Sequence, residues 1–260
     1  MRRLMIPATP PVSPAIDGKP RRREVPEFRK LALVSILSGA MAGLVWFAVQ
    51  YLAVVPLIQK AELFESSAHT HPIASLEEHH KENDWHPEDG WERNAITAAS
   101  TVLTAIGLAA VLFGIIHALG RKLNARRGVL WGLAGFLCLN VAPSIGLPPR
   151  PPGIIQADLA GRQLWWLATV VLTAVGLWLL TGQSRPRWFH RLAGVVAILL
   201  PHIAGAPSAT GQTLVPHQLI TEFALASLFA AAIFWITLGF LGGFFLNTPG
   251  KAASDVVTRP

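Results

Sequence analysis

The chain has 260 residues, of which 52% are hydrophobic and only 14% are charged, and its formal net charge is +7. Several apolar runs reach the roughly 20 residues that a helix needs to cross a bilayer, which leaves little length for a soluble domain. We therefore expect a single integral membrane domain, in which the one cysteine, Cys138, excludes an internal disulfide.

Residues 1–30 are expected to form a disordered cytoplasmic arm. They are basic, contain six prolines and carry almost no aromatic side chains, a composition that cannot build a packed core. A cleaved signal peptide is disfavoured, because the apolar run that follows is about twice as long as a typical signal core.

The apolar runs predict an all-α integral membrane protein, a six-span helical bundle over residues 31–247. The expected spans are 31–58, 95–119, 128–147, 164–181, 192–206 and 219–246. The fifth is the weakest because Pro201 interrupts it, so five true spans remain the alternative. Three spans carry glycines four residues apart, a spacing that allows helix backbones to touch: Gly39 with Gly43, Gly128 with Gly132, and Gly239 with Gly243.

The lysines and arginines are unevenly distributed among the expected loops. The amino-terminal arm, the loops after the second and fourth spans, and the tail 248–260 together hold 17 of the 22. Because basic loops stay in the cytoplasm, we expect both termini there. The expected location is a bacterial inner membrane. This distribution also indicates contacts with membrane lipid and no nucleic-acid partner.

The loop expected at 59–94 lies on the opposite, outer side and is unusual in composition. Five histidines and nine carboxylates fall between positions 61 and 93. Imidazole and carboxylate together suit borderline divalent ions such as cobalt, nickel and zinc, so the histidines are candidate metal ligands: His69, His71, His79, His80 and His86. The competing interpretation is a solvated acidic loop with incidental histidines, since such tracts are compositional signals only.

Further polar side chains are expected on the same outer side. His202 follows Pro201 at the end of the fifth span, and His217 and Glu222 lie at the start of the sixth. All three are added as candidate metal ligands. Gln50 and Asn140, at the outer ends of two spans, are either hydrogen-bond glue between helices or the lining of a vestibule.

Several stretches together resemble one family, the CbtA-type membrane subunit of a proposed cobalt transporter linked to cobalamin biosynthesis. They are Trp85 to Arg93 (W-H-P-E-D-G-W-E-R), Leu130 to Phe136 (L-W-G-L-A-G-F), the loop with Ala142-Pro143 and Pro148-Pro149, Asp158 to Trp166, and Pro201-His202 before Gly205-Ala206-Pro207. The resemblance covers about residues 31–246.

The resemblance implies cobalt uptake beside a small one-span, CbtB-like subunit, and it implies His69, His71, His86 and His202 as the outer histidines. Arg150 departs from the family pattern, because an acidic residue is expected there. A cation at this position would not assist the passage of a metal ion, which puts that loop in doubt as a ligand site.

The function expected from these observations is capture and transfer of a metal ion. The acidic, histidine-rich loop concentrates Co²⁺ (or Ni²⁺) as the transported ion, and His202 receives it. No permanently bound cofactor and no catalysis are expected, and no G-x-S-x-G turn of a hydrolase occurs. No Walker A loop occurs either, so a partner or the membrane potential is expected to drive transport unless the flow is downhill. The alternative is a membrane metal sensor or assembly factor that binds metal without transporting it. Nothing in the ligand types separates cobalt from nickel or zinc.

Overall fold

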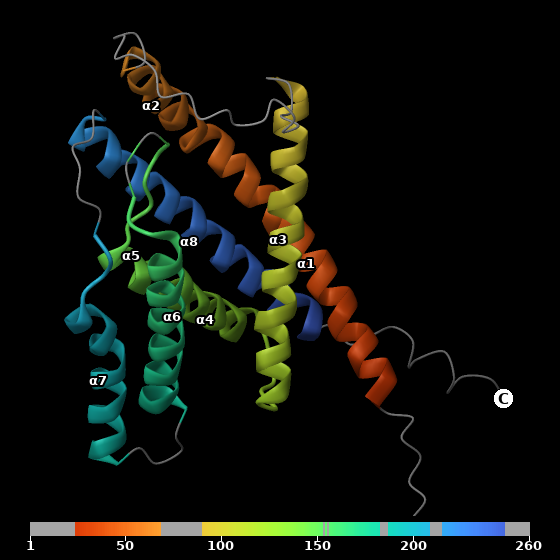
Figure 1. The fold of residues 1–260 in the computed structure, drawn as a ribbon. Helices are drawn as coiled ribbons and strands as arrows, with labels where there is room; N and C mark the ends of the chain where they lie inside the picture. Colours follow the sequence, from red (N-terminus) through yellow and green to blue (C-terminus); the bar gives the residue numbers. More distant parts are fainter. Residues whose placement is uncertain are drawn as a thin grey trace, which may run out of the picture.

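The computed structural model describes residues 24–68, 90–152, 154, 156–182, 187–208 and 215–247, and none of these residues lies in a strand. In chain order the elements are α1 (Glu24–Ala53), α2 (Val55–Ala68), α3 (Trp91–Ala118), α4 (Ala125–Phe136), the π-helical turn η2 (Leu137–Val141), α5 (Ala142–Gly146), α6 (Leu159–Thr181), α7 (Trp188–Ala204) and α8 (His217–Asn247). The expectation of an all-helical architecture is confirmed over this part of the chain (Figure 1).

Within the described residues, five helical stretches are long and apolar enough to cross a membrane. They are Phe28–Ala53, Trp91–Ala118, Ala125–Gly146, Leu159–Thr181 and His217–Asn247. The remaining expected span corresponds to α7, which is apolar but has only 17 residues. At 1.5 Å per residue α7 is about 25 Å long, less than the roughly 30 Å of a hydrocarbon core. Five of the six expected spans are thus supported by length and composition, and the fifth expected span, 192–206, stays a prediction.

The short helix α7 lies antiparallel to α6. Gly176 of α6 and Gly194 of α7 face each other so closely that a Cβ on Gly176 would lie 2.7 Å from the Gly194 carbonyl oxygen. At the far end of this hairpin, Trp165 Nε1 near the start of α6 donates to the carbonyl oxygen of Pro201 near the end of α7, at 3.1 Å. The chain therefore returns to the end from which α6 began before it enters α8 (Figure 1).

The first expected span and the loop after it differ from the structure. Helix α1 ends at Ala53, Val54 forms a turn, and α2 continues to Ala68, so helix replaces the first ten residues of the expected loop 59–94. Pro56, which has no backbone N–H, explains the interruption. The helix continues because apolar side chains persist on one face: buried Ala61 packs with Leu219 at the start of α8.

Close backbone contact at glycines holds the bundle together, as the glycine spacing predicts. Gly128 and Gly132 of α4 face Gly239 and the Trp235 carbonyl of α8 at distances that leave no room for a Cβ. On the other side, a Cβ on Gly39 of α1 would lie 2.6 Å from the Cα of Ile106 in α3. Helix α8 also packs against α1, so α1 and α8 form the centre of the bundle.

The ends of the helices sort into two groups (Figure 1). The start of α1 and the ends of α3, α6 and α8 lie at one end, with the basic residues Arg121, Lys122, Arg187 and Arg191 in the adjacent loops and helix starts. Lys30 Nζ donates to the carbonyl oxygen of Leu246 there, at 3.1 Å. The end of α2 and the starts of α3, α6 and α8 lie at the other end, which we call the histidine end because the segment 69–89 connects α2 to α3 there.

We predict that Gly132→Ala destabilises the protein by about 1–3 kcal/mol, because the new Cβ meets the backbone of α8 and two packed helices must separate. Unfolding of the detergent-solubilised protein by sodium dodecyl sulfate measures the loss. Gly107→Ala is the matched control, since a Cβ on this glycine of α3 has nothing within 4 Å. Equal stability of the two variants would contradict the glycine contact.

Candidate functional site

The five histidines of the expected outer loop, His69, His71, His79, His80 and His86, lie outside the described residues. Their role as metal ligands therefore stays a prediction. Within the described ranges, no group of three or more His, Cys, Asp or Glu side chains is arranged to hold a metal ion. The candidates that can be placed are His202, His217 and Glu222.

His202 occupies a protected position in the last turn of α7. Its ring packs edge-on against Trp165 of α6, with centroids 5.9 Å apart at an interplanar angle of 68°. Both ring nitrogens are buried and neither has a hydrogen-bond partner in the described part of the chain. Leaving a buried polar group unpaired costs about 1–3 kcal/mol, so this position favours a ligand that the described residues do not supply.

Trp165 fixes the surroundings of His202. A Cβ on Gly146, the last residue of α5, would lie 2.5 Å from the Trp165 ring and 2.8 Å from the Cβ of Ala206. The indole thus fills the space where the end of α5 meets the segment after α7, and its N–H is used by the Pro201 carbonyl. The imidazole of His202 is therefore held by its ring contact and its nitrogens are left available.

His217 and Glu222 do not extend this site. Both side chains are exposed at the start of α8, and five residues along a helix place them about 140° apart around its axis. Glu222 Oε1 accepts a hydrogen bond from Gln218 Nε2 at 2.8 Å. It also lines a pocket of about 360 Å³ between α2 and α8 that contains Lys60, a cation that opposes metal binding.

Asn140 acts as glue between helices. Its Oδ1 accepts a hydrogen bond from Trp235 Nε1 of α8 at 2.8 Å, and its backbone carbonyl accepts one from Ser144 Oγ at 2.6 Å. The hydroxyls of Thr97 and Ser100 bond to carbonyls of their own helix. Of the two interpretations of these outer polar residues, the structure favours packing for Asn140.

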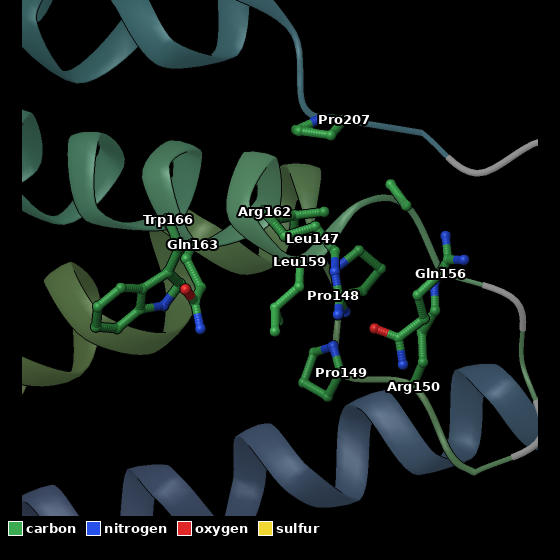
Figure 2. Close-up of a pocket in the computed structure, with 11 residues that line it drawn as sticks. Leu147, Pro148, Pro149, Arg150, Gln156, Leu159, Arg162, Gln163, Trp166 and Pro207 are labelled. Atoms are coloured by element: carbon green, nitrogen blue, oxygen red, sulfur yellow. The ribbon is translucent and has the colours of Figure 1, made fainter. Parts of the chain in front are cut away.

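A polar hollow at the histidine end lacks the side chains of a metal site. It has a volume of about 340 Å³ and is lined by the segment Leu147 to Arg150, by residues of early α6 and by Pro207 (Figure 2). Its charged side chains are Arg150 and Arg162, and no histidine or carboxylate lines it. The position of Arg150 thus agrees with the expectation that this loop does not bind metal.

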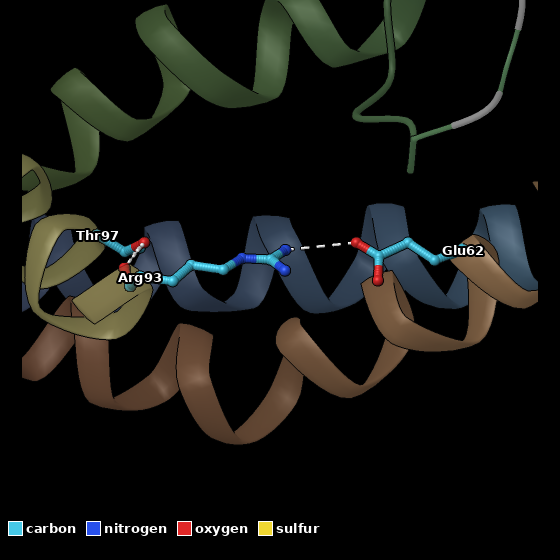
Figure 3. A network of polar contacts seen from close by, with 3 residues as sticks. All are labelled: Glu62, Arg93 and Thr97. Atoms are coloured by element: carbon cyan, nitrogen blue, oxygen red, sulfur yellow. Dashed lines mark hydrogen bonds and ion pairs between the residues drawn. The ribbon is translucent and has the colours of Figure 1, made fainter. Parts of the chain in front are cut away.

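An ion pair joins the two helices that flank the histidine-rich segment. Arg93 Nη2 of α3 lies 3.3 Å from Glu62 Oε1 of α2, and Thr97 donates to the Arg93 carbonyl on the same turn (Figure 3). Both charged groups are substantially exposed, so the pair contributes at most about 1 kcal/mol. Its value is geometric, because it joins α2 to α3.

Sequence patterns missed two features of this region. The role of Trp165 as the partner of His202 depends on antiparallel packing of α6 on α7, and the adjacent Trp165-Trp166 pair was the only signal of it. The π-helical turn η2, which carries Cys138 and Asn140, has no sequence signature that we recognise.

Comparison with known proteins gave one match. The family model described as "Probable cobalt transporter subunit (CbtA)" matches residues 28–247. No curated protein and no solved structure matches the chain.

We predict that His202→Phe leaves the stability of the metal-free protein unchanged or raises it. The phenyl ring keeps the contact with Trp165 and removes two buried, unpaired nitrogens. His202→Ala, which opens a cavity, should cost about 2 kcal/mol or more. Thermal unfolding in detergent with a chelator present compares the two, and an equal loss in both would show that the imidazole has a structural partner.

Proposed function

Because the chain belongs to the CbtA family of probable cobalt transporter subunits, we propose that it captures cobalt at its histidine end and passes the ion into the helical bundle. Membership of a transporter-subunit family and five helices long and apolar enough to cross a membrane support a multi-pass membrane subunit, for which no catalytic activity is proposed. The observation that carries the proposed path is the buried imidazole of His202, whose two nitrogens have no partner among the described residues.

Capture is assigned to the segment 69–89. Its carboxylates raise the local concentration of divalent cations, and the imidazoles of His69, His71, His79, His80 and His86 replace part of the hydration shell. Ligands on such a segment exchange readily, which suits an ion that must be released again. The Glu62–Arg93 pair joins the two helices between which this segment runs in the sequence.

His202 is the proposed next station. One imidazole supplies one ligand, so the ion would keep water or ligands from the capturing segment while it is bound there. The preceding Pro201 lies inside α7 and has no backbone N–H, so the helix lacks one backbone hydrogen bond beside His202. His217 and Glu222 are proposed only as additional attracting groups near the start of α8.

The membrane potential is sufficient to drive such transfer. The charge distribution favours an orientation with the histidine end outside and the opposite end, with its basic residues, in the cytoplasm. In this orientation a dication that moves inward gains about 4.6 kcal/mol at 100 mV, from about 2.3 kcal/mol per charge. We propose a bacterial inner membrane as the location and a small one-span, CbtB-like protein as the partner subunit. The chemistry of imidazole and carboxylate accepts Ni²⁺ as well as Co²⁺.

A metal sensor or assembly factor is the second candidate function. It is favoured by the absence of a grouped metal site along the described helices, because a transporter needs successive stations across the membrane. The two functions differ in one measurable quantity, the cobalt content of cells.

Replacing His69, His71, His79, His80 and His86 with alanine should weaken Co²⁺ binding at least about tenfold, the loss of roughly one good ligand. For the unmodified protein, affinity should fall as the pH drops below about 6, because imidazole with a pKa near 6.5 is then protonated and cannot coordinate. Titration calorimetry in detergent at two pH values measures both effects. The control variant His117→Ala/His190→Ala removes two histidines near the opposite end of the bundle and should bind Co²⁺ normally. Unchanged affinity in the five-histidine variant would show that the segment 69–89 does not bind the ion.

His202→Phe should reduce the accumulation of radioactive cobalt by cells several-fold while leaving equilibrium binding to the purified protein nearly intact. The substitution removes a transfer station and not the capturing ligands. Uptake is measured with and without the small neighbouring subunit. Wild-type uptake by the His202→Phe variant would remove His202 from the path, and cobalt content that does not change on deletion of the whole chain would support the sensor.

A further inference from the structure

Two arginines at the histidine end have no counter-charge among the residues that the structure describes. Arg150 and Arg162 line the same pocket of about 340 Å³, and neither guanidinium has a hydrogen bond or ion pair with a residue that the structure describes. The Nε atom of Arg162 is buried and unpaired. Asp158, the nearest carboxylate in sequence, is used to cap α6, where its Oδ2 accepts from the Gly161 N–H at 2.9 Å.

These arginines cannot be explained as topology signals. Basic residues that orient a membrane protein gather on the cytoplasmic side, whereas Arg150 and Arg162 lie at the opposite end of the bundle. Arg93, at that same end, is paired with Glu62. Two unpaired guanidinium groups facing one hollow repel each other and any metal ion, so their arrangement favours an anion between them.

The remaining lining specifies what kind of anion fits. Gln156 and Gln163 add amide groups that donate hydrogen bonds, while Leu159 and Trp166 form an apolar wall (Figure 2). The planar, forked guanidinium matches the oxygens of a phosphate, which it binds with two parallel hydrogen bonds. A pocket with cationic, amide and apolar sides suits a phosphate that is attached to a hydrocarbon chain.

The pocket also lies at the right depth for a lipid headgroup. Arg162 precedes the apolar run 164–181 by two residues, and the half-exposed Trp166 follows closely. Tryptophan concentrates at the boundary between headgroups and hydrocarbon. The strongly exposed Leu159 and Leu164 on the same helix present apolar surface to the acyl chains next to this pocket.

We propose that this pocket binds the phosphate group of an anionic phospholipid from the leaflet at the histidine end. The phosphate bridges Arg150 on the segment after α5 and Arg162 on α6, and the first acyl carbons lie against Leu159 and Trp166. The bound lipid thereby connects the α6–α7 hairpin to the rest of the bundle and neutralises two positive charges close to His202.

Native mass spectrometry of the full chain, released from detergent with added phosphatidylglycerol, tests this site. The wild-type protein should retain one tightly bound lipid, and Arg150→Gln/Arg162→Gln should bind it at least about tenfold more weakly, since each charge-assisted contact is worth that much. The single variants Arg162→Gln and Lys60→Gln form a matched pair, because each removes one cation from the same end and only Arg162 lines the pocket. Only the first should lose affinity.

A second arm identifies the source of the phosphate. Inorganic phosphate at millimolar concentration should fail to displace the lipid, because it lacks the apolar contacts. Displacement by inorganic phosphate would indicate that the pocket binds a free anion, and it would refute the proposal that its ligand is a phospholipid. Equal lipid retention by the double variant and the wild type, or an equal loss in Lys60→Gln, would overturn the site itself. The outcome is independent of cobalt uptake.

Discussion

The close approach of glycine-lined helix backbones is the constraint on which this structure depends. Inside a bilayer, lipid tails solvate apolar side chains as well as other side chains do, so burial alone does not drive helices together. The protein instead uses positions without a Cβ, where α4 meets α8 and α1 meets α3, and fills the remaining core with rings such as the stacked Trp46 and Phe234, 4.6 Å apart. The α6–α7 hairpin that carries His202 uses the same device, since Gly176 and Gly194 meet at a distance that leaves no room for a Cβ.

Sequence reasoning succeeded where a local pattern has one physical meaning. A run of apolar residues long enough for a bilayer gave α3, α6 and α8 to within a few residues, and glycines four apart identified the contact faces. It was less successful where structure depends on packing between distant segments. The extension of the helix beyond the first expected span accompanies packing of Ala61 against Leu219 of α8, a contact that a hydropathy pattern does not show.

In the candidate site, too, sequence patterns identified individual residues but not which residues from distant segments lie together. His202 was identified from its place beside Pro201, yet its isolation from His217 and Glu222 follows only from the arrangement of α7 and α8. Asn140 was recognised as a polar residue at membrane depth, but the choice of Trp235 as its partner depends on α4 packing against α8. Arg150 stood out as an unexpected cation, whereas its proximity to Arg162 required the chain to fold back along α6.

The π-helical turn Leu137–Val141 has a consequence for the whole bundle. A regular helix rotates by about 100° per residue, so inserting one residue into a turn shifts the angular phase of everything beyond it by that amount. Before the insertion, α4 presents its glycines to α8; after it, α5 faces α6 and Gly146 receives the Trp165 ring. One extra residue thus allows the continuous helical stretch Ala125–Gly146 to contact α8 with its first half and α6 with its second half. A helix of strictly regular pitch would turn one of these two contact faces away from its neighbour.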